Sequence, residues 1–229
     1  MTVKLHNMAQ GSDEWRDARC GLLTASEMKL IVTPTLKIAA NEKERAHLYE
    51  LLAQRITKYV EPSYQSEDML KGYAGEIIAR ELYAQQNGVA VAECGLITND
   101  KWGFVLGYSP DGLVGRDGQI EVKSRRQKYQ IQTIIEDVSI GAIAADYLIQ
   151  VQTGLLVSER AWCDFLSYSP GLPMTTVRVH PAPEVQEAIL AAATSFEERI
   201  VERLSQYKAS LAAARSVPTE RVDLSEIAA

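Results

Sequence analysis

The stretch from Ser109 to Lys123 constrains the fold of this chain more than any other. Within it, Asp117-Gly118 is a strong signal for the turn of a β-hairpin. The residues after this turn alternate between polar and apolar, which places Glu121 and Lys123 on one face of a strand. The hairpin would fold Asp111 back toward Glu121, so we expect two carboxylates and one ammonium group at one sheet surface.

Two carboxylates that lie close together repel each other unless a proton or a cation lies between them. Mg²⁺ suits such a pair, because it takes oxygen ligands and usually keeps several waters. A bound metal makes its water more acidic and neutralises charge on a phosphoryl oxygen. The neighbouring Lys123 could orient the attacking water and stabilise negative charge. The stretch therefore predicts either phosphodiester hydrolysis or, more simply, a surface hairpin with solvated charges.

The length of 229 residues and the hydrophobic content of 46% fit one large domain or a domain with an appendage. We expect a single domain over residues 1–215 and a tail over 216–229 that is mobile or bound to a partner. No apolar run approaches the length of a membrane span, and the N-terminus lacks the apolar segment of a signal peptide. These features predict a cytoplasmic protein with no membrane partner.

The formal net charge of −6 argues mildly against nucleic acid as a partner, but local basic surface matters more than net charge. Residues 123–130 carry four basic residues and no acid, whereas acids accumulate from Glu184 onward. The four basic residues are Lys123, Arg125, Arg126 and Lys128. The uneven distribution leaves nucleic acid open as a ligand.

A second candidate site lies near the N-terminus. Ser12 can cap a helix that carries Arg19, and a second helix start is expected over residues 23–27. The free N–H groups of a helix start, with the hydroxyls of Thr24 and Ser26 and with Arg19 nearby, could bind a phosphate. The alternative is that these hydroxyls are only helix caps.

The remaining pattern alternates helices and strands. Asn41 and Glu44 predict a helix to about Val60, with a buried stripe of Tyr49, Leu52, Ile56, Tyr59 and Val60. A further helix from Ser66 to Gly88 carries Met69 and Glu76, and its Gly72 and Gly75 suggest that another backbone or a ligand approaches closely at Glu76.

Strands are predicted over 89–109, 160–168 and 175–180, and helices over 127–138 and from Pro183 to about Leu211. The run 147–157 fits strand or helix, with its spacing favouring helix.

This order of elements is that of the PD-(D/E)xK nucleases, and the chain more narrowly resembles the phage lambda exonuclease, or YqaJ-type viral recombinase, family. Five segments that span about residues 10–170 carry the resemblance. They are Trp15 with Arg19 to Glu27, Glu76, Ser109 to Leu113, Glu121 to Lys123, and Tyr147 to Gln152. The resemblance implies a restriction-endonuclease-like α/β fold with a central mixed β-sheet flanked by helices.

The resemblance also implies roles for individual residues. Asp111, Glu121 and the Val122 carbonyl would hold Mg²⁺, with Mn²⁺ as a substitute, and Lys123 would assist the attacking water. Glu76 and Gln150 would line the same pocket. The residues implied in 5′-phosphate binding are Arg19, Thr24, Ser26 and Ser109. Contacts to DNA are assigned to Lys37, Met69, Arg125, Arg126 and Lys128, although the loop 33–41 around Lys37 matches poorly and Met69 also suits a core role.

Together these features predict a Mg²⁺-dependent 5′→3′ exonuclease that degrades one strand of linear duplex DNA. The resemblance implies a homotrimeric ring around the duplex, a single-strand annealing protein as partner in recombination, and a phage or prophage origin in a bacterial host. The alternatives are a PD-(D/E)xK endonuclease, a relative with an iron–sulfur cluster, and a non-catalytic module that binds DNA ends. A cluster needs four placed cysteines, and the chain has only Cys20, Cys94 and Cys163.

Overall fold

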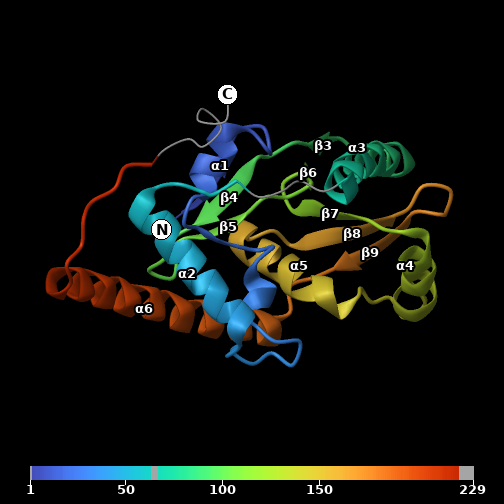
Figure 1. Ribbon diagram of the computed structural model, residues 1–229. Helices are drawn as coiled ribbons and strands as arrows, with labels where there is room; N and C mark the ends of the chain where they lie inside the picture. Colours follow the sequence, from blue (N-terminus) through green and yellow to red (C-terminus); the bar gives the residue numbers. More distant parts are fainter. Residues whose placement is uncertain (1, 63–66, 222–229) are drawn as a thin grey trace.

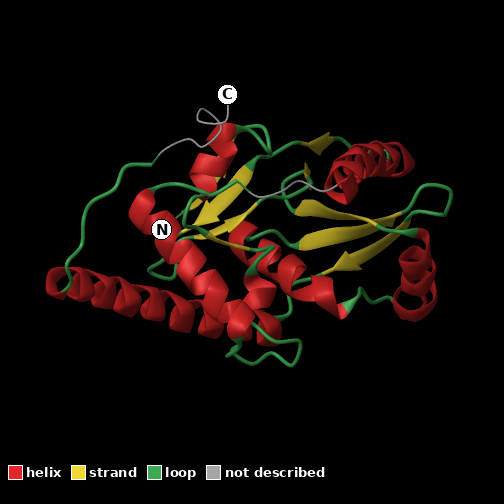
Figure 2. Cartoon of the chain, viewed as in Figure 1, coloured by secondary structure: helices red, strands yellow, loops and turns green. Residues whose placement is uncertain are grey.

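The computed structural model of the protein describes residues 2–62 and 67–221, without the side chains of residues 67–71. The expected mixed α/β architecture is confirmed, but the strands form two mixed sheets instead of one (Figures 1 and 2). The smaller sheet has the order β1-β4-β5-β2, and its strands are β1 (Val3–His6), β4 (Leu96–Asn99), β5 (Leu106–Tyr108) and β2 (Leu23–Thr24). Its β2–β5 pair is parallel and its other pairs are antiparallel.

The larger sheet carries the predicted acidic hairpin. Its order is β3-β6-β7-β8-β9, and only the β7–β8 pair is parallel. Its strands are β3 (Val91–Ala92), β6 (Gly112–Val114), β7 (Gly118–Ser124), β8 (Trp162–Tyr168) and β9 (Thr175–Val179). Gly112 pairs with Ile120 in the antiparallel β6–β7 ladder, so the hairpin and its register are as the sequence predicts.

Helices cover the larger sheet, with α3 on one face and α5 on the other (Figure 1). The long helix α6 packs along α2 and α5 at the far end from α4. The α-helices are α1 (Asp13–Arg19), α2 (Glu42–Thr57), α3 (Glu67–Asn87), α4 (Gln127–Gln132), α5 (Ala145–Ser158) and α6 (Pro183–Ala213). Shorter turns of helix are η1 (Met28–Leu30), the π-helical η2 (Thr133–Asp137) and η3 (Val138–Ile140).

The side chains of β7 point alternately into the hydrophobic core and toward the candidate site. Ile120 and Val122 are buried and pack with Ala79 and Tyr83 of α3. Glu121 and Lys123 point to the opposite face, because successive side chains of a strand point to opposite sides. One strand therefore anchors α3 with its apolar residues and presents its charged residues to the α5 side.

The expected second helix start at residues 23–27 is wrong. Leu23 and Thr24 instead pair in parallel with Leu106 and Gly107 of β5, and the Ala25 N–H donates to the Gly107 carbonyl at 2.8 Å. Only the short 3₁₀ turn η1 follows. The sheet takes the Ala25 N–H, while the Thr24 N–H donates to the Glu27 carboxylate at 3.3 Å. Thr24 therefore belongs to a strand and not to a helix start.

The predicted buried stripe of α2 is right for Leu52 and wrong for Tyr49 and Ile56. Tyr59 and Val60 lie beyond the end of α2 at Thr57. Asn41 caps the helix as expected, accepting from Lys43 and Glu44 N–H groups at 3.0 and 3.1 Å. The buried face, however, is formed by Glu44, His47, Leu48, Leu51 and Leu52, while Tyr49 and Ile56 are exposed. The face is rotated because α6 buries polar residues of α2: Arg199 pairs with Glu44 at 2.6 Å, and Phe196 stacks on His47.

Further features of the described chain concern the run 147–157, the cysteines and the predicted tail. The run 147–157 is helical as its spacing favours, within α5, and its Gln152 finds partners in the His180 carbonyl and the Ala182 N–H, both at 2.8 Å. The cysteines are free thiols, two of them buried. Residues 216–221 of the predicted tail have no regular secondary structure, and residues 222–229 lie outside the described part.

Within the described residues, no single helix is long and apolar enough to cross a membrane. One bent pair, Gln127–Ile140 with Ala145–Ser158, meets that criterion by length and composition alone.

Candidate active site

The hairpin places Asp111 directly before β6 and beside the second half of β7, which carries Glu121 and Lys123. Its Oδ2 accepts a hydrogen bond of 2.6 Å from the main-chain N–H of Val122. The N–H and C=O groups of one strand residue point to the same side, so the Val122 carbonyl also faces the side of Asp111. The β6–β7 pairing ends at Gly112 and Ile120, which leaves this edge of β7 open beside Asp111.

Glu121 is the buried centre of the site. Its Oε1 accepts from Lys123 Nζ at 2.7 Å and from Gln150 Nε2 of α5 at 2.5 Å. Its Oε2 accepts from the hydroxyl of Tyr108 at 3.1 Å. The structure thus brings together three residues predicted to act here and adds a fourth, Tyr108, from the neighbouring sheet.

Burial and charge repulsion both raise the pKa values of two acids in the site. Burial, Glu121 and Glu76 together raise the pKa of Asp111 well above its usual range. Burial also raises the pKa of Glu76, with Lys123 opposing and Glu121 adding to the shift. Burial disfavours the charged form of Lys123, but Glu121 and Asp111 outweigh it and raise the pKa of the ammonium group. Lys123 therefore stays protonated and acts as a donor.

The donor set fits a hard divalent cation. Asp111 and Glu121 offer carboxylate oxygens, and the Val122 carbonyl faces the same side, which is the oxygen chemistry that Mg²⁺ prefers. Burial is the largest cause of the raised pKa of Asp111, and the negative charges of Glu121 and Glu76 add to it. A bound cation would neutralise that charge. The described residues contain no group of three or more His, Cys, Asp or Glu side chains arranged to hold a metal. The site would therefore rest on two carboxylates, one carbonyl and water.

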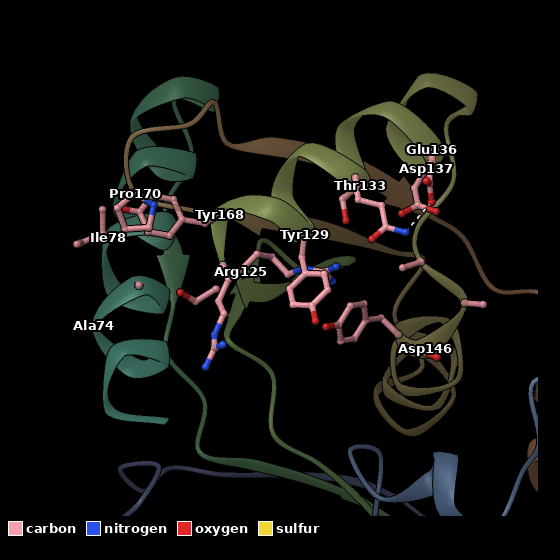
Figure 3. A pocket seen from close by; sticks show the side chains of 17 residues that line it. Ala74, Ile78, Arg125, Tyr129, Thr133, Glu136, Asp137, Asp146, Tyr168 and Pro170 are labelled. Carbon is pink, nitrogen blue, oxygen red and sulfur yellow. Dashed lines mark hydrogen bonds between the residues drawn. The ribbon is translucent and has the colours of Figure 1, made fainter. Parts of the chain in front are cut away.

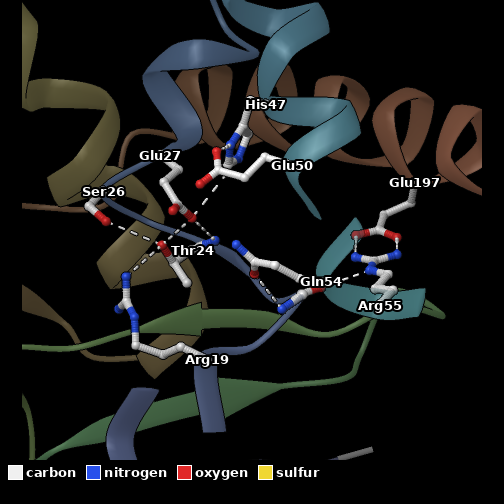
Figure 4. A network of polar contacts seen from close by, with 10 residues as sticks. Arg19, Thr24, Ser26, Glu27, His47, Glu50, Gln54, Arg55 and Glu197 are labelled. Carbon is white, nitrogen blue, oxygen red and sulfur yellow. Dashed lines mark hydrogen bonds and ion pairs between the residues drawn. The ribbon is translucent and has the colours of Figure 1, made fainter. Parts of the chain in front are cut away.

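The four residues predicted to bind phosphate are joined by hydrogen bonds, and Figure 4 shows Arg19, Thr24 and Ser26 among them. Arg19 donates from Nη1 to Ser109 Oγ and from Nη2 to Thr24 Oγ1, both at 3.2 Å. The hydroxyls of Thr24 and Ser26 also lie 3.2 Å apart. We call Arg19, Thr24, Ser26 and Ser109 the hydroxyl–arginine cluster. A guanidinium and three hydroxyls offer several hydrogen bonds to one anion.

Neighbouring side chains hold this cluster in place. The ring of Trp15 lies under the Arg19 guanidinium at 4.3 Å, and its Nε1 donates to Ser109 Oγ at 3.0 Å. Glu27 accepts from the Thr24 hydroxyl at 2.7 Å, and buried His47 lies 4.0 Å from the same carboxylate (Figure 4). Burial lowers the pKa of Arg19, with Glu27 opposing that shift.

Close helix–strand contact explains a glycine in α3. A Cβ built on Gly75 would lie 2.5 Å from Ser124 Oγ, so only glycine permits this approach of α3 to the end of β7. The contact brings Glu76 near Lys123, and Arg80 one turn later donates to the Asp111 carbonyl at 3.2 Å. The expected close approach at Gly75 is therefore present, whereas a Cβ on Gly72 meets no described atom within 4 Å.

The residues assigned to DNA contacts are more scattered. Arg125, Arg126 and Lys128 follow β7 directly, and Arg126 is the N-cap residue of α4. Lys37 is exposed on the loop after η1 and, among the described residues, its side chain contacts no other predicted site residue. The side chain of Met69 lies outside the described part.

Sequence reasoning assigned no role to Tyr108, Trp15 or Tyr147, although all three contact the site. Lys123 Nζ lies 5.4 Å from the ring centroid of Tyr147. Tyr147 is three positions before Gln150, so helical spacing puts both on one side of α5. Tyr108 and Trp15 contact the site across the chain, at Glu121 and Ser109, and no local pattern reveals such contacts.

Comparison with known proteins identifies a family and several similar structures. Residues 14–161 match the family model for the YqaJ-like viral recombinase domain. The crystal structure of an alkaline exonuclease, LHK-Exo, from Laribacter hongkongensis is 30% identical with a TM-score of 0.70, covering 87% of this chain and 100% of that one. The complex of LHK-Exo with dAMP is 32% identical with a TM-score of 0.72 and the same coverage.

More distant matches are consistent with the fold. A phage related exonuclease from Haemophilus somnus 129PT is 14% identical with a TM-score of 0.55, over 80% of this chain and 96% of that one, which shows the fold alone. Uncharacterized protein R354 from Acanthamoeba polyphaga mimivirus is 26% identical over 172 residues, or 71% of this chain. The match spans 30% of the length of that relative.

Proposed function

The chain belongs to the YqaJ-like viral recombinase domain family, and on that premise we propose that it is a Mg²⁺-dependent 5′→3′ exonuclease acting on linear duplex DNA. Its similarity to alkaline exonucleases supports a role as a DNA exonuclease. The observation that carries the finer proposal is that the hydroxyl–arginine cluster adjoins the acids: Arg19 bonds Ser109, which is two residues before Asp111.

The catalytic roles follow from the contacts of each side chain. Asp111, Glu121 and the Val122 carbonyl would hold the Mg²⁺, for which Mn²⁺ could substitute. When bound, the metal supplies a more acidic water and charge neutralisation at the phosphoryl oxygen. Gln150 and Tyr108 keep Glu121 oriented through their hydrogen bonds at 2.5 and 3.1 Å.

Lys123 would work as a hydrogen-bond donor and not as a base. Its raised pKa keeps the ammonium charged, so it can hold the attacking water and stabilise the negative charge that develops on the phosphate. Glu76, whose pKa is raised by burial, lies across from Lys123 and is the group able to take up a proton from that water.

The direction of digestion would come from the hydroxyl–arginine cluster. A terminal 5′-phosphate held by Arg19, Thr24, Ser26 and Ser109 would place the next phosphodiester at the acids. Each cut would then release a 5′-mononucleotide and present a new 5′-phosphate to the cluster. A 3′ end carries no terminal phosphate for this cluster to hold, so digestion should run 5′→3′.

The proposal includes a trimeric assembly and a partner protein. Processive digestion would be easier if three subunits closed into a ring by heterologous contacts, with Arg125, Arg126 and Lys128 facing the channel and the acids after Glu184 outside it or at subunit contacts. Light scattering near three times the chain mass of 25.3 kDa would support the ring, and a monomer would exclude it. The single strand left behind would pass to an annealing protein in phage-type recombination.

One assay separates this proposal from its alternatives. Linear and covalently closed circular duplexes are incubated with the protein in Mg²⁺, in Mn²⁺ or in EDTA. The proposal requires digestion of the linear duplex with either metal, none in EDTA, and intact circles throughout. Cleaved circles would indicate an endonuclease, and binding to ends without hydrolysis would indicate a non-catalytic module.

A further inference from the structure

A large cleft opens beside the end of β7 (Figure 3). Its volume is about 990 Å³. One wall comes from α3 and the end of β8, and the other comes from α4, η2 and the start of α5 (Figure 3). Ser124 and Arg125 form its floor immediately after Lys123. The cleft is thus a direct continuation of the catalytic strand.

Two tyrosines and an arginine of the cleft lining lie close together. The guanidinium of Arg125 lies 5.2 Å from the ring centroid of Tyr147 and 5.7 Å from that of Tyr129. Tyr129 is exposed, and Tyr147 lies between Arg125 and Lys123. Among the described residues, Arg125 forms no ion pair, so its charge is available to a ligand. Tyr147 is half-buried. Aromatic rings beside a positively charged group are typical of single-stranded nucleic acid sites.

The other lining residues make the two ends of the cleft differ in charge. Glu136, Asp137 and Asp146 carry negative charge at the end away from Arg125 (Figure 3). Phosphates would therefore lie at the Arg125 end and be repelled from the other. Thr133 lines the same cleft, is 2% exposed, and its buried Oγ1 has no hydrogen-bond partner among the described residues. An orphaned hydroxyl offers a hydrogen bond to the edge of a base.

We propose that this cleft binds the nucleotides of the cut strand that lie 3′ of the scissile bond, with a base against Tyr129 and Tyr147 and a phosphate on Arg125. The inference rests on the proposed function for the direction of the strand. Arg19 contacts Ser109, which lies two positions before Asp111 in the chain. Further contacts join Glu121 to Lys123, Lys123 to Tyr147, and Tyr147 to Arg125. A strand with its terminal phosphate at Arg19 and its scissile bond at the acids would continue into the cleft.

The test is equilibrium binding of 5′-phosphorylated single strands in EDTA, where no hydrolysis is expected. Fluorescence anisotropy compares a dinucleotide with tetra-, hexa- and octanucleotides on the whole protein. For wild type, affinity should rise once the strand is long enough to reach Tyr129. Tyr129→Ala should lose that rise, which makes the longer strands bind roughly 5- to 100-fold more weakly, and should leave the dinucleotide unchanged.

Two variants keep the result specific. Tyr129→Phe retains the ring and should bind the longer strands like wild type. Tyr207→Ala is the matched control, because Tyr207 is 42% exposed against 43% for Tyr129. Tyr207 belongs to α6, and Figure 1 shows α6 away from α4, which carries Tyr129. Arg125→Gln should lower the slope of log affinity against log salt by about 0.7, the value for one phosphate contact to a single strand.

Several results of the binding experiment would contradict the inference or the proposed function. Wild-type affinity that does not rise with length, or a Tyr129→Ala protein that binds every length like wild type, would overturn the inference. So would a Tyr129→Ala protein that loses only binding of free dAMP, because the cleft would then hold a released nucleotide. Binding that depends on Tyr129 in a protein that hydrolyses no DNA would defeat the proposed function and leave a single-strand site standing.

Discussion

The guanidinium of Arg19 donates a 3.2 Å hydrogen bond to the hydroxyl of Ser109, ninety positions later in the chain. Ser109 is followed after one residue by Asp111, whose carboxylate accepts from the Val122 N–H. A cluster able to hold a phosphate is therefore tied by one short loop to the acids that would hold a metal. In the proposed mechanism this connection would set the distance between the terminal phosphate and the scissile bond.

Arg19→Ala should erase the preference for 5′-phosphorylated ends. The expected loss on phosphorylated duplex is about 10- to 100-fold, because a charge-assisted pair of hydrogen bonds is removed. Digestion of 5′-hydroxyl duplex should change much less. Initial rates on the two substrates measure the ratio, with Arg45→Ala, an exposed arginine of α2, as control. Equal losses on both substrates would mean that Arg19 has only a structural role.

Asp111→Asn and Lys123→Met should separate metal binding from chemistry. Asp111→Asn removes a carboxylate ligand, so calorimetry should detect little Mg²⁺ binding and activity should be lost. Lys123→Met removes a donor but no ligand, so Mg²⁺ should still bind while turnover falls by about 10²- to 10³-fold. Near wild-type turnover in either variant would refute the assignment of that residue.

Metal-free protein should become less stable as pH rises through the titration of Asp111. Its pKa is raised in the folded state by burial and by Glu121 and Glu76. Between the unfolded value of about 3.9 and the raised folded value, the unfolded chain binds fewer protons than the folded chain, so the free energy of unfolding falls with pH. Asp111→Asn removes this penalty and keeps an oxygen that can accept from Val122.

The measurement is thermal unfolding in EDTA. At pH 8, Asp111→Asn should melt above wild type by about 2–4 °C, the shift that roughly 1 kcal/mol produces in a chain of this size. The difference should shrink toward pH 4, which is close to the unfolded pKa of about 3.9, so that the carboxyl is protonated in the folded state and about half protonated in the unfolded state. Mg²⁺ at pH 8 should raise the melting temperature of wild type only. A variant that melts below wild type at pH 8 would contradict the repulsion inferred here.

Gly75→Ala should destabilise the protein and impair catalysis, whereas Gly72→Ala should do neither. The added methyl at residue 75 would meet Ser124 Oγ at 2.5 Å and force α3 away from β7, at a cost of roughly 1–3 kcal/mol. At residue 72 the space is open, and alanine should stabilise the helix by up to about 1 kcal/mol. Urea unfolding and initial rates test both, and equal stabilities would rule out the close approach.

Local sequence signals were sufficient for the acidic hairpin. Asp117-Gly118 sets the turn, and alternation along β7 separates Glu121 from Val122, so the site could be predicted without tertiary information. The division into two sheets could not, because β2 and β5 pair in parallel across some eighty residues and β2 has only two. Short strands with distant partners leave no periodicity to detect.

The buried face of α2 was missed for a related reason. Glu44 and His47 are polar, and only their partners on α6, Arg199 and Phe196, make their burial favourable. A pattern based on apolar residues therefore selected Tyr49 and Ile56, which are exposed. Tyr108 was missed because its bond to Glu121 joins the two sheets. Contacts between distant segments determine such residues, and these contacts follow from the fold.

The polarity of digestion tests the central claim most directly. Linear duplexes with 5′-phosphates carry hydrolysis-resistant phosphorothioate linkages at both 5′ ends or at both 3′ ends and are digested in Mg²⁺. If the hydroxyl–arginine cluster holds a terminal 5′-phosphate beside Asp111 and Glu121, protected 3′ ends should not slow the reaction and protected 5′ ends should stop it. Digestion that stops at protected 3′ ends, or proceeds past protected 5′ ends, would contradict the account.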